Sequence, residues 1–133
     1  MQYDEFLSRV QEMAKLDSQD DAEAFTRVIL GTLGERIYRS RRDSLSAQLP
    51  GELKEMLGTR TEPETTRKDV DRFPVQEFHN RVCARADIAY NRAVAVTGSV
   101  MAVLREAVTA REWADLQAEL PGDYDQILQY LPS

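Results

Sequence analysis

The hydrophobic positions of the chain recur with helical spacing. Phe6 and Val10 lie at i and i+4, and a longer apolar stripe covers residues 22–37 with a period close to that of an α-helix. The same two patterns return at residues 78–86 and 94–108. No segment alternates apolar and polar residues in the way that a half-buried strand does. The sequence therefore predicts an all-α fold.

Residues that start and end helices divide each half of the chain into four predicted helices. In the first half, Ser18 with Asp21 resembles a capping box, and Pro50 stops the third helix because its ring removes a backbone donor. In the second half, Thr109 with Glu112 makes the same kind of start. The expected helices run through residues 4–14, 18–37, 41–49 and 53–57, and then 78–86, 94–108, 109–120 and 124–131.

The two halves also resemble each other residue by residue. Residues 3–16 align with 75–88, and residues 18–57 align with 89–128 when Asp17 is skipped. The identities cluster in motifs: Glu5-Phe6 and Arg9-Val10 recur as Glu77-Phe78 and Arg81-Val82, and Leu45-Ser-Ala-Gln-Leu-Pro-Gly51 recurs as Leu116-Gln-Ala-Glu-Leu-Pro-Gly122. This pattern indicates an internal duplication.

The duplication sets the expected domain organisation. We expect a first helical repeat at residues 1–57, a linker at 58–72 and a second helical repeat at 73–133. A unit of about 55 residues buries too little surface to be stable alone, so the copies should pack together. The expected architecture is two tandem copies of a four-helix unit, packed as a pseudo-twofold helical bundle with the long helices at its centre, like a homodimer joined by a linker.

Composition and charge narrow the classes of partner. The formal net charge of −6 repels nucleic acid and anionic membranes on average, so neither is expected as a partner. No stretch approaches the roughly 20 apolar residues of a membrane-spanning helix. The single cysteine, Cys83, agrees with a reducing compartment, and we expect a cytoplasmic protein.

Several motifs in order resemble a known bacterial family. They are Asp4-Glu-Phe-Leu-x-Arg-Val10, Leu33-Gly-Glu-Arg36, Ala47-Gln-Leu-Pro-Gly-Glu-Leu53, Leu104-Arg-Glu-Ala-Val108 and Ala118-Glu-Leu-Pro-Gly-Asp-Tyr124. Over nearly the whole chain this order resembles the family catalogued as domain of unknown function 2267. The resemblance implies an all-helical, cytoplasmic bacterial protein with no established activity or catalytic residues. Family members often have a Ser-Gly-Gly-Glu-like turn before the third helix, where this chain has Tyr38-Arg-Ser-Arg-Arg42.

That departure places a basic cluster between the second and third helices. Guanidinium groups bind carboxylate or phosphate, and a tyrosine ring stacks on a base or on another arginine. The cluster could instead pair with nearby acids or favour a helix dipole, and nucleic acid is a further alternative. The aligned residues of the second copy are not basic, so the fold does not require the cluster. The candidate partner-binding residues are Arg36, Tyr38, Arg39, Arg41 and Arg42.

The other polar residues are expected to stabilise the fold rather than to take part in a reaction. His79 and Cys83 are one turn apart, but a metal site needs more ligands of these types, so no metal is expected there. They are either a half-buried structural pair or a reactive thiol with its base. Glu35 and Glu106 recur near the ends of the long helices, where an acid is unfavourable, so each should meet a basic or amide donor from another helix.

The sequence carries no phosphate-binding glycine loop, nucleophile elbow or histidine-rich metal motif, so neither an enzyme nor a cofactor is expected. The leading hypothesis is a non-catalytic helical interaction module, an adaptor or accessory subunit that binds a protein partner. The alternative is a small-molecule binder or sensor with a pocket between the two repeats. The sequence is compatible with both a monomer and a homo-oligomer.

Overall fold

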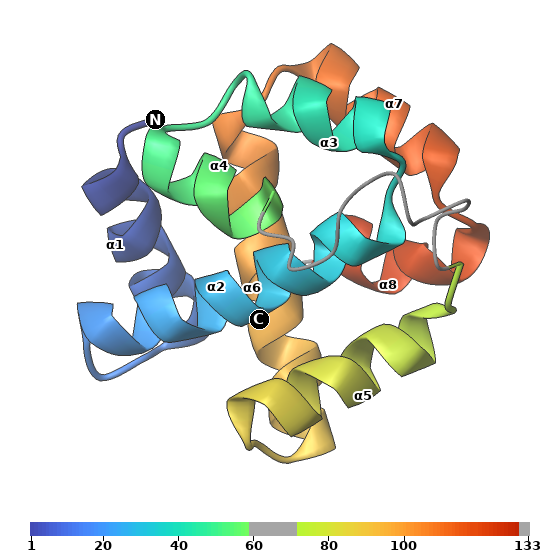
Figure 1. The fold of residues 1–133 in the computed structure, drawn as a ribbon. Coiled ribbons are helices and arrows are strands. Elements are labelled where there is room, and N and C mark those ends of the chain that lie inside the picture. The colour runs from blue at the N-terminus through green and yellow to red at the C-terminus, as the bar shows by residue number, and fades with distance from the viewer. Residues whose placement is uncertain (59–71, 131–133) are drawn as a thin grey trace.

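The computed structural model of the chain describes residues 1–58 and 72–130, and these residues form helices without any strand (Figure 1). The predicted all-α fold is confirmed. The helices are α1 (Tyr3–Ala14), α2 (Gln19–Arg36), α3 (Arg39–Ser46), α4 (Gly51–Gly58), α5 (Val75–Ala86), α6 (Tyr90–Ala107), α7 (Ala110–Glu119) and α8 (Asp125–Leu128), with a 3-10 turn at Gly122–Tyr124 before α8. Of the predicted linker, only Gly58 and Arg72 lie within the described residues.

Side-chain caps begin two of the helices as the sequence predicted. Ser18 Oγ accepts the Asp21 N–H at 3.1 Å, and Thr109 Oγ1 accepts the Glu112 N–H at 3.2 Å. The second cap is only half of a capping box, because the Glu112 carboxylate turns away to contacts from α3. Lys15 ends α1 in the left-handed conformation.

Several helix boundaries differ from the prediction. α5 begins at Val75 rather than at residue 78, and α6 begins at Tyr90 rather than at residue 94. The third helix starts at Arg39 rather than Arg41 and ends at Ser46, and two turn residues separate it from Leu49. The predicted closing helix over 124–131 is a 3-10 turn followed by the four residues of α8. Leu131 lies outside the described residues.

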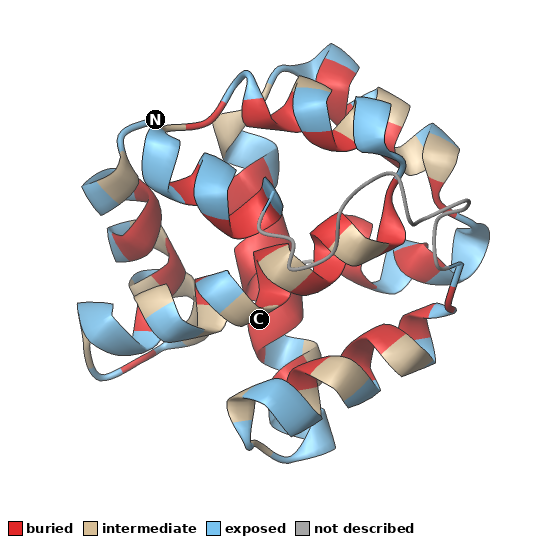
Figure 2. Cartoon of the chain, viewed as in Figure 1, coloured by how far each residue is buried: buried red, intermediate tan, exposed pale blue. Residues whose placement is uncertain are grey.

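The two long helices, α2 and α6, cross at the centre of the molecule (Figure 1). α1 and α5 each pack against both of them, α4 packs on α2, and α8 packs on α6. Residues 96–101 of α6 are buried without interruption (Figure 2). Over these six residues α6 is covered on all sides and presents no face to water.

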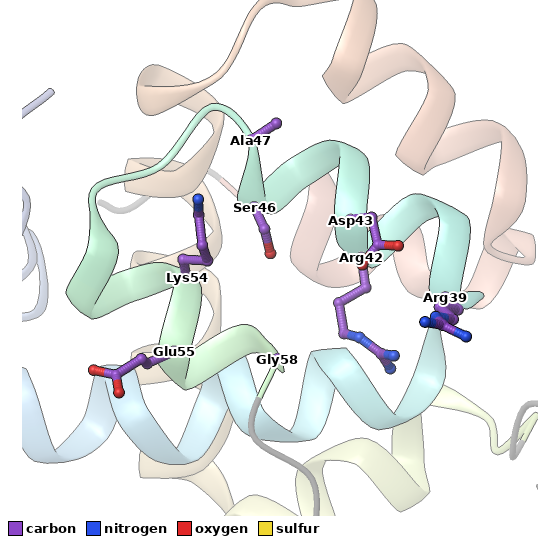
Figure 3. A pocket seen from close by; sticks show the side chains of 8 residues that line it. All are labelled: Arg39, Arg42, Asp43, Ser46, Ala47, Lys54, Glu55 and Gly58. Atoms are coloured by element: carbon purple, nitrogen blue, oxygen red, sulfur yellow. The ribbon is translucent and has the colours of Figure 1, made fainter. Parts of the chain in front are cut away.

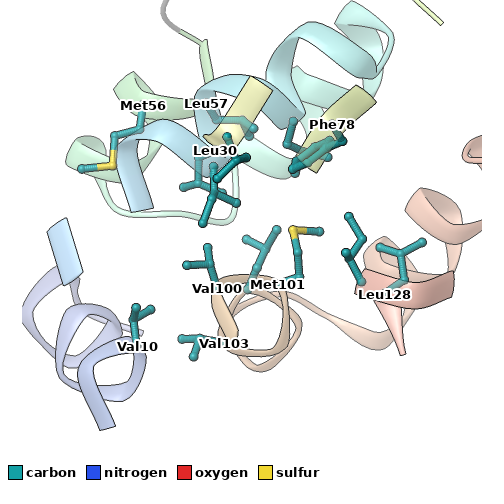
Figure 4. Packing of buried hydrophobic residues seen from close by; sticks show 14 of the residues in the cluster. Val10, Leu30, Met56, Leu57, Phe78, Val100, Met101, Val103 and Leu128 are labelled. Carbon is teal, nitrogen blue, oxygen red and sulfur yellow. The ribbon is translucent and has the colours of Figure 1, made fainter. Parts of the chain in front are cut away.

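The core is one continuous cluster of apolar side chains drawn from all eight described helices. Figure 4 shows Leu30 of α2 facing Val100 of α6, with Val10 of α1, Met56 of α4 and Phe78 of α5 in the same apolar cluster. No helix in the described part of the chain is long and apolar enough to cross a membrane.

Ion pairs link the two halves at the periphery of this core. Glu35 of α2 lies 3.0 Å from Arg81 and 2.9 Å from Arg85, both on α5. Glu106 of α6 lies 2.8 Å from Arg9 of α1. The prediction that each glutamate meets a basic donor from another helix is confirmed, and the donors neutralise an acid at an unfavourable helix end.

Glycine allows the closest approach between α2 and α4. A β-carbon at Gly34 would overlap the carbonyl oxygen of Leu57, whereas one at Gly31 would lie 3.8 Å from that of Met56, an ordinary contact. We predict that Gly34→Ala lowers the free energy of unfolding by about 2 kcal/mol or more, because backbone must move. Gly31→Ala should raise it by about 0.5 kcal/mol through helix propensity. Urea unfolding measures both, and equal effects at the two positions would contradict the close approach.

Candidate functional site

Arg36, the first of the predicted partner-binding residues, is buried between the two halves of the chain. Only 6% of the residue is exposed, and its Nε donates to the carbonyl oxygen of Phe73 at 2.8 Å. The Tyr124 hydroxyl donates to the same oxygen at 2.8 Å, and the Arg36 guanidinium lies 5.2 Å from the Tyr124 ring centroid. Burial raises the pKa of Tyr124 to about 12. Arg36 therefore fixes the point where the chain enters the second half.

Arg41 lies at the seam between α3 and α7. Its Nη1 is 3.0 Å from Glu112, and its Nε is 3.4 Å from Glu119. Asp115 is 3.7 Å from the same Nη1. The Ser44 hydroxyl donates to the second oxygen of Glu112 at 2.7 Å. One guanidinium thus holds three carboxylates, and Glu112 is only 5% exposed.

Glu119 has a second role at the same seam. Its Oε2 accepts the backbone N–H of Tyr38 at 2.8 Å, which satisfies a free donor at the start of α3. Burial raises the pKa of the Glu119 carboxyl above its ordinary value, and the charge of Arg41 and its hydrogen bond act in the opposite direction. The start of α3 is therefore capped by a residue from the other half of the chain.

Tyr38 and Arg39 are the two predicted residues that face solvent. Tyr38 is 40% exposed, one of three large hydrophobic residues exposed among those the structure describes. The guanidinium of Arg72 stacks on its ring at 5.3 Å and donates to its hydroxyl. We call Tyr38, Arg39 and Arg72 the Tyr38 corner. Its aromatic ring is held between a capped helix start and a cation.

Arg42 lines a groove between α3 and α4 with a volume of about 670 Å³ (Figure 3). The residue is 5% exposed, and its Nη1 is 3.4 Å from the carbonyl oxygen of Gly34. Arg39 lies on the same wall one turn earlier, and Lys54 lies on α4. The other charged or hydroxyl groups lining this α3–α4 groove are Asp43, Ser46 and Glu55.

The predicted cluster is therefore divided among separate environments. Arg39 and Arg42 both line the α3–α4 groove, whereas Arg36 and Arg41 make contacts between the two halves of the chain. The sequence pattern assigned Glu112 only to a helix start, and it gave no role to Asp115, Glu119, Lys54 or Arg72. One available signal was that Arg41 aligns with Glu112, which places opposite charges at matching positions of the two halves.

A second groove of about 370 Å³ lies between the halves. Arg27, Gly31 and Glu35 of α2 form one wall, Met56 comes from α4, and Arg85 comes from α5. Arg85 donates to Thr32 and pairs with Glu35, so this cation is engaged within the protein. The groove is smaller than the α3–α4 groove and carries fewer charged groups.

His79 is fully buried, and Cys83 is half-buried with a free thiol. The Nδ1 of His79 lies 3.4 Å from the Tyr90 hydroxyl, and its buried Nε2 has no partner among the described residues. Burial lowers the pKa of His79 below its ordinary value, which favours the neutral imidazole at pH 7. Within the described residues, no group of three or more His, Cys, Asp or Glu side chains is placed to hold a metal ion.

The Arg41 contacts predict a charge exchange. Arg41→Glu should lower the free energy of unfolding by about 2–4 kcal/mol, because it leaves a buried carboxylate beside like charges. The double variant Arg41→Glu with Glu112→Arg should recover at least half of the loss. Arg111→Glu makes the same charge change at an exposed position of α7 and should stay within about 0.5 kcal/mol of the parent. In urea unfolding, additive losses in the double variant would refute the pairing.

The buried imidazole predicts a pH dependence from the one histidine of the chain. The unfolded chain takes up a proton near pH 6.5, whereas the folded protein resists it to lower pH. The free energy of unfolding should therefore fall as pH drops below about 6.5. His79→Leu, which installs the residue of the aligned position, Leu7, should have a flatter profile between about pH 7 and 5.5. Parallel urea profiles for the two proteins would show that His79 is not protected from protonation.

The comparison with known proteins agrees with the motif resemblance. One family model matches residues 3–127, which include every helix from α1 to α7 and most of α8, and its description is "Uncharacterized conserved protein (DUF2267)". No curated protein matches the chain. The match covers more than half of the sequence, so the chain belongs to the DUF2267 family of uncharacterized conserved proteins.

Proposed function

We propose that this chain is a non-catalytic helical interaction module that binds an acidic protein partner through the Tyr38 corner. In this proposal the scaffold consists of two tandem copies of a four-helix unit, residues 1–57 and 73–133, related by a pseudo-twofold axis. The single observation that carries the proposed function is the exposed Tyr38, with the Arg72 guanidinium stacked on its ring and Arg39 next to it in sequence, in an otherwise acidic protein.

Matching helix lengths support the tandem scaffold. α1 and α5 both have 12 residues, and α2 and α6 both have 18. The packing is reciprocal as well, since α1 contacts α6 and α5 contacts α2. The proposed pseudo-twofold axis would exchange these two contacts.

Matching polar contacts also support the scaffold. The Tyr38 N–H donates to Glu119, and the aligned Thr109 N–H donates to Gln48, both at 2.8 Å. Gln48 is the residue that aligns with Glu119. The ion pairs Arg9–Glu106 and Arg81–Glu35 are related in the same way.

The Tyr38 corner has the properties of a binding hot spot. Tyrosine and arginine are enriched among the residues that dominate interface energies. Tyr38 follows the buried end of α2, and the Glu119 cap holds its backbone, so little conformational entropy is lost on binding. The aligned residues, Thr109 and Ala110, are neither aromatic nor basic, so the fold itself does not require the side chains of Tyr38 and Arg39.

Charge favours an acidic partner. The corner carries Arg39 and Arg72, while the whole chain has a net charge of −6. A local cationic patch on an anionic protein orients a partner whose contact surface is acidic. Two further arginines that the sequence predicted as binding residues, Arg36 and Arg41, support the corner in this proposal through their contacts between the halves, whereas Arg42 lines the α3–α4 groove.

The alternative, a small-molecule binder or sensor, is favoured by the groove of about 370 Å³ that both halves line. Its volume falls within the range of ligand pockets. We rank this function second because Glu35 and Thr32 already engage Arg85, the one lining cation from the second half.

The test is a variant that installs the residues of the second half, Tyr38→Thr with Arg39→Ala. Affinity purification from the native host should identify a partner of the parent chain, and the purified pair then gives a Kd. We predict a loss of about tenfold or more in affinity for the variant, with an unchanged urea midpoint, because an exposed anchor is removed. Binding of the parent should weaken with added salt.

The matched control is Tyr90→Gln with Arg111→Ser, which replaces an exposed tyrosine and an exposed arginine elsewhere by the aligned residues of the first half. It should keep the affinity of the parent. Equal binding by the test variant and the parent would reject the Tyr38 corner as the contact.

A further inference from the structure

The α3–α4 groove concentrates positive charge in an acidic protein. Three cationic side chains, Arg39, Arg42 and Lys54, line it against two carboxylates. Figure 3 shows Arg42 and Ser46 extending from α3 toward the space between the helices, and Lys54 extending from α4 toward α3. The volume of about 670 Å³ lies in the middle of the range for small-molecule sites.

The second half of the chain offers an internal comparison. Trp113 stands at the position aligned with Arg42, and it is 3% exposed in the core. Asp125 aligns with Lys54, and Ala110 aligns with Arg39. The aligned positions of the second half therefore carry none of the three cations. The basic groove of the first half is an addition to the fold.

The side chains of the groove select the ligand class. Arg39 and Arg42 are three residues apart on α3 and so project from one face, where their planar guanidiniums suit a phosphate group. Ser46, Lys54 and Glu55 provide hydroxyl, ammonium and carboxylate partners for hydroxyl groups. Among the described residues that line the groove none is aromatic, so they offer a nucleobase no ring to stack on.

We propose that the α3–α4 groove binds a small phosphorylated polyol, with the phosphate on Arg39 and Arg42 and the hydroxyl groups facing Ser46, Lys54 and Glu55. This site shares Arg39 with the Tyr38 corner, but Lys54 and Ser46 belong to the groove alone. It also differs from the groove between the halves, because α3 and α4 both belong to the first half.

The test uses ribose 5-phosphate as the probe, with ribose, inorganic phosphate and adenosine monophosphate for comparison. Two-dimensional amide NMR of the full chain locates any binding by residue. We expect saturable shifts confined to residues 39–47 and 51–58, and a Kd at least about tenfold lower than for inorganic phosphate, since the hydroxyl contacts add affinity. Ribose alone should give no saturable shift.

Two substitutions in the groove, each of which installs the aligned residue of the second half, test the contacts directly. Lys54→Asp and Arg39→Ala should each raise the Kd about tenfold, because each removes a charge-assisted contact. Lys15→Asp is the matched control: it makes the same charge change at an exposed position outside the groove, and the aligned Asp87 adopts the same left-handed conformation there. Its Kd should stay within about twofold of the parent. Because Lys54 lies outside the Tyr38 corner, Lys54→Asp tests the groove without disturbing protein binding.

Four results with the parent chain would overturn the proposal, and a fifth comes from the variants. They are a Kd for ribose 5-phosphate above about 1 mM, an equal Kd for inorganic phosphate, tighter binding of adenosine monophosphate than of ribose 5-phosphate, and shifts centred on Arg27 and Arg85 instead of α3 and α4. An unchanged Kd in both Lys54→Asp and Arg39→Ala would also contradict it.

Discussion

The crossing of α2 and α6 is the contact on which the rest of the structure depends. Each half of the chain has fewer than 62 residues and is too short to enclose a core of its own. The other helices of the same half cannot cover the whole apolar stripe of its long helix. Burying one long helix against the other, with α1 and α5 bridging them, gives a single core. The positions of the polar features follow from this arrangement, since residues at the ends of α2 and α6 are brought against the opposite half.

Charges then fix how the halves meet. The apolar core is non-directional and tolerates some sliding, whereas an ion pair between buried or half-buried groups is specific in position. Arg41 with its three carboxylates, and Glu35 with Arg81 and Arg85, sit on two different sides of the crossing. Arg36, with Tyr124 and the Phe73 carbonyl, adds a third fixed point. The exposed Tyr38 corner and the α3–α4 groove are thereby held on rigid elements, which both proposed binding functions require.

Periodicity was sufficient to predict the helical class and most helix positions, because each apolar stripe has to face a core. The partners of Glu35 and Glu106 were also predictable, since an acid at a helix end needs a donor. The burial of Arg36 and Arg42 was not predictable, because their partners are backbone carbonyls whose positions depend on packing far away in sequence. The early start of α3 has the same origin, as its cap is Glu119.

The contact between Arg41 and Glu112 bears on how a duplicated chain evolves. On the tandem scaffold proposed above, these are equivalent positions that face each other near the axis. In a dimer of identical subunits, such a position meets its own copy, so a charge there always meets a like charge and is selected against. Joining two copies in one chain removes that constraint, and each copy can then evolve the charge that the other lacks. The pair therefore makes the halves obligate to each other, because neither surface is complementary to itself.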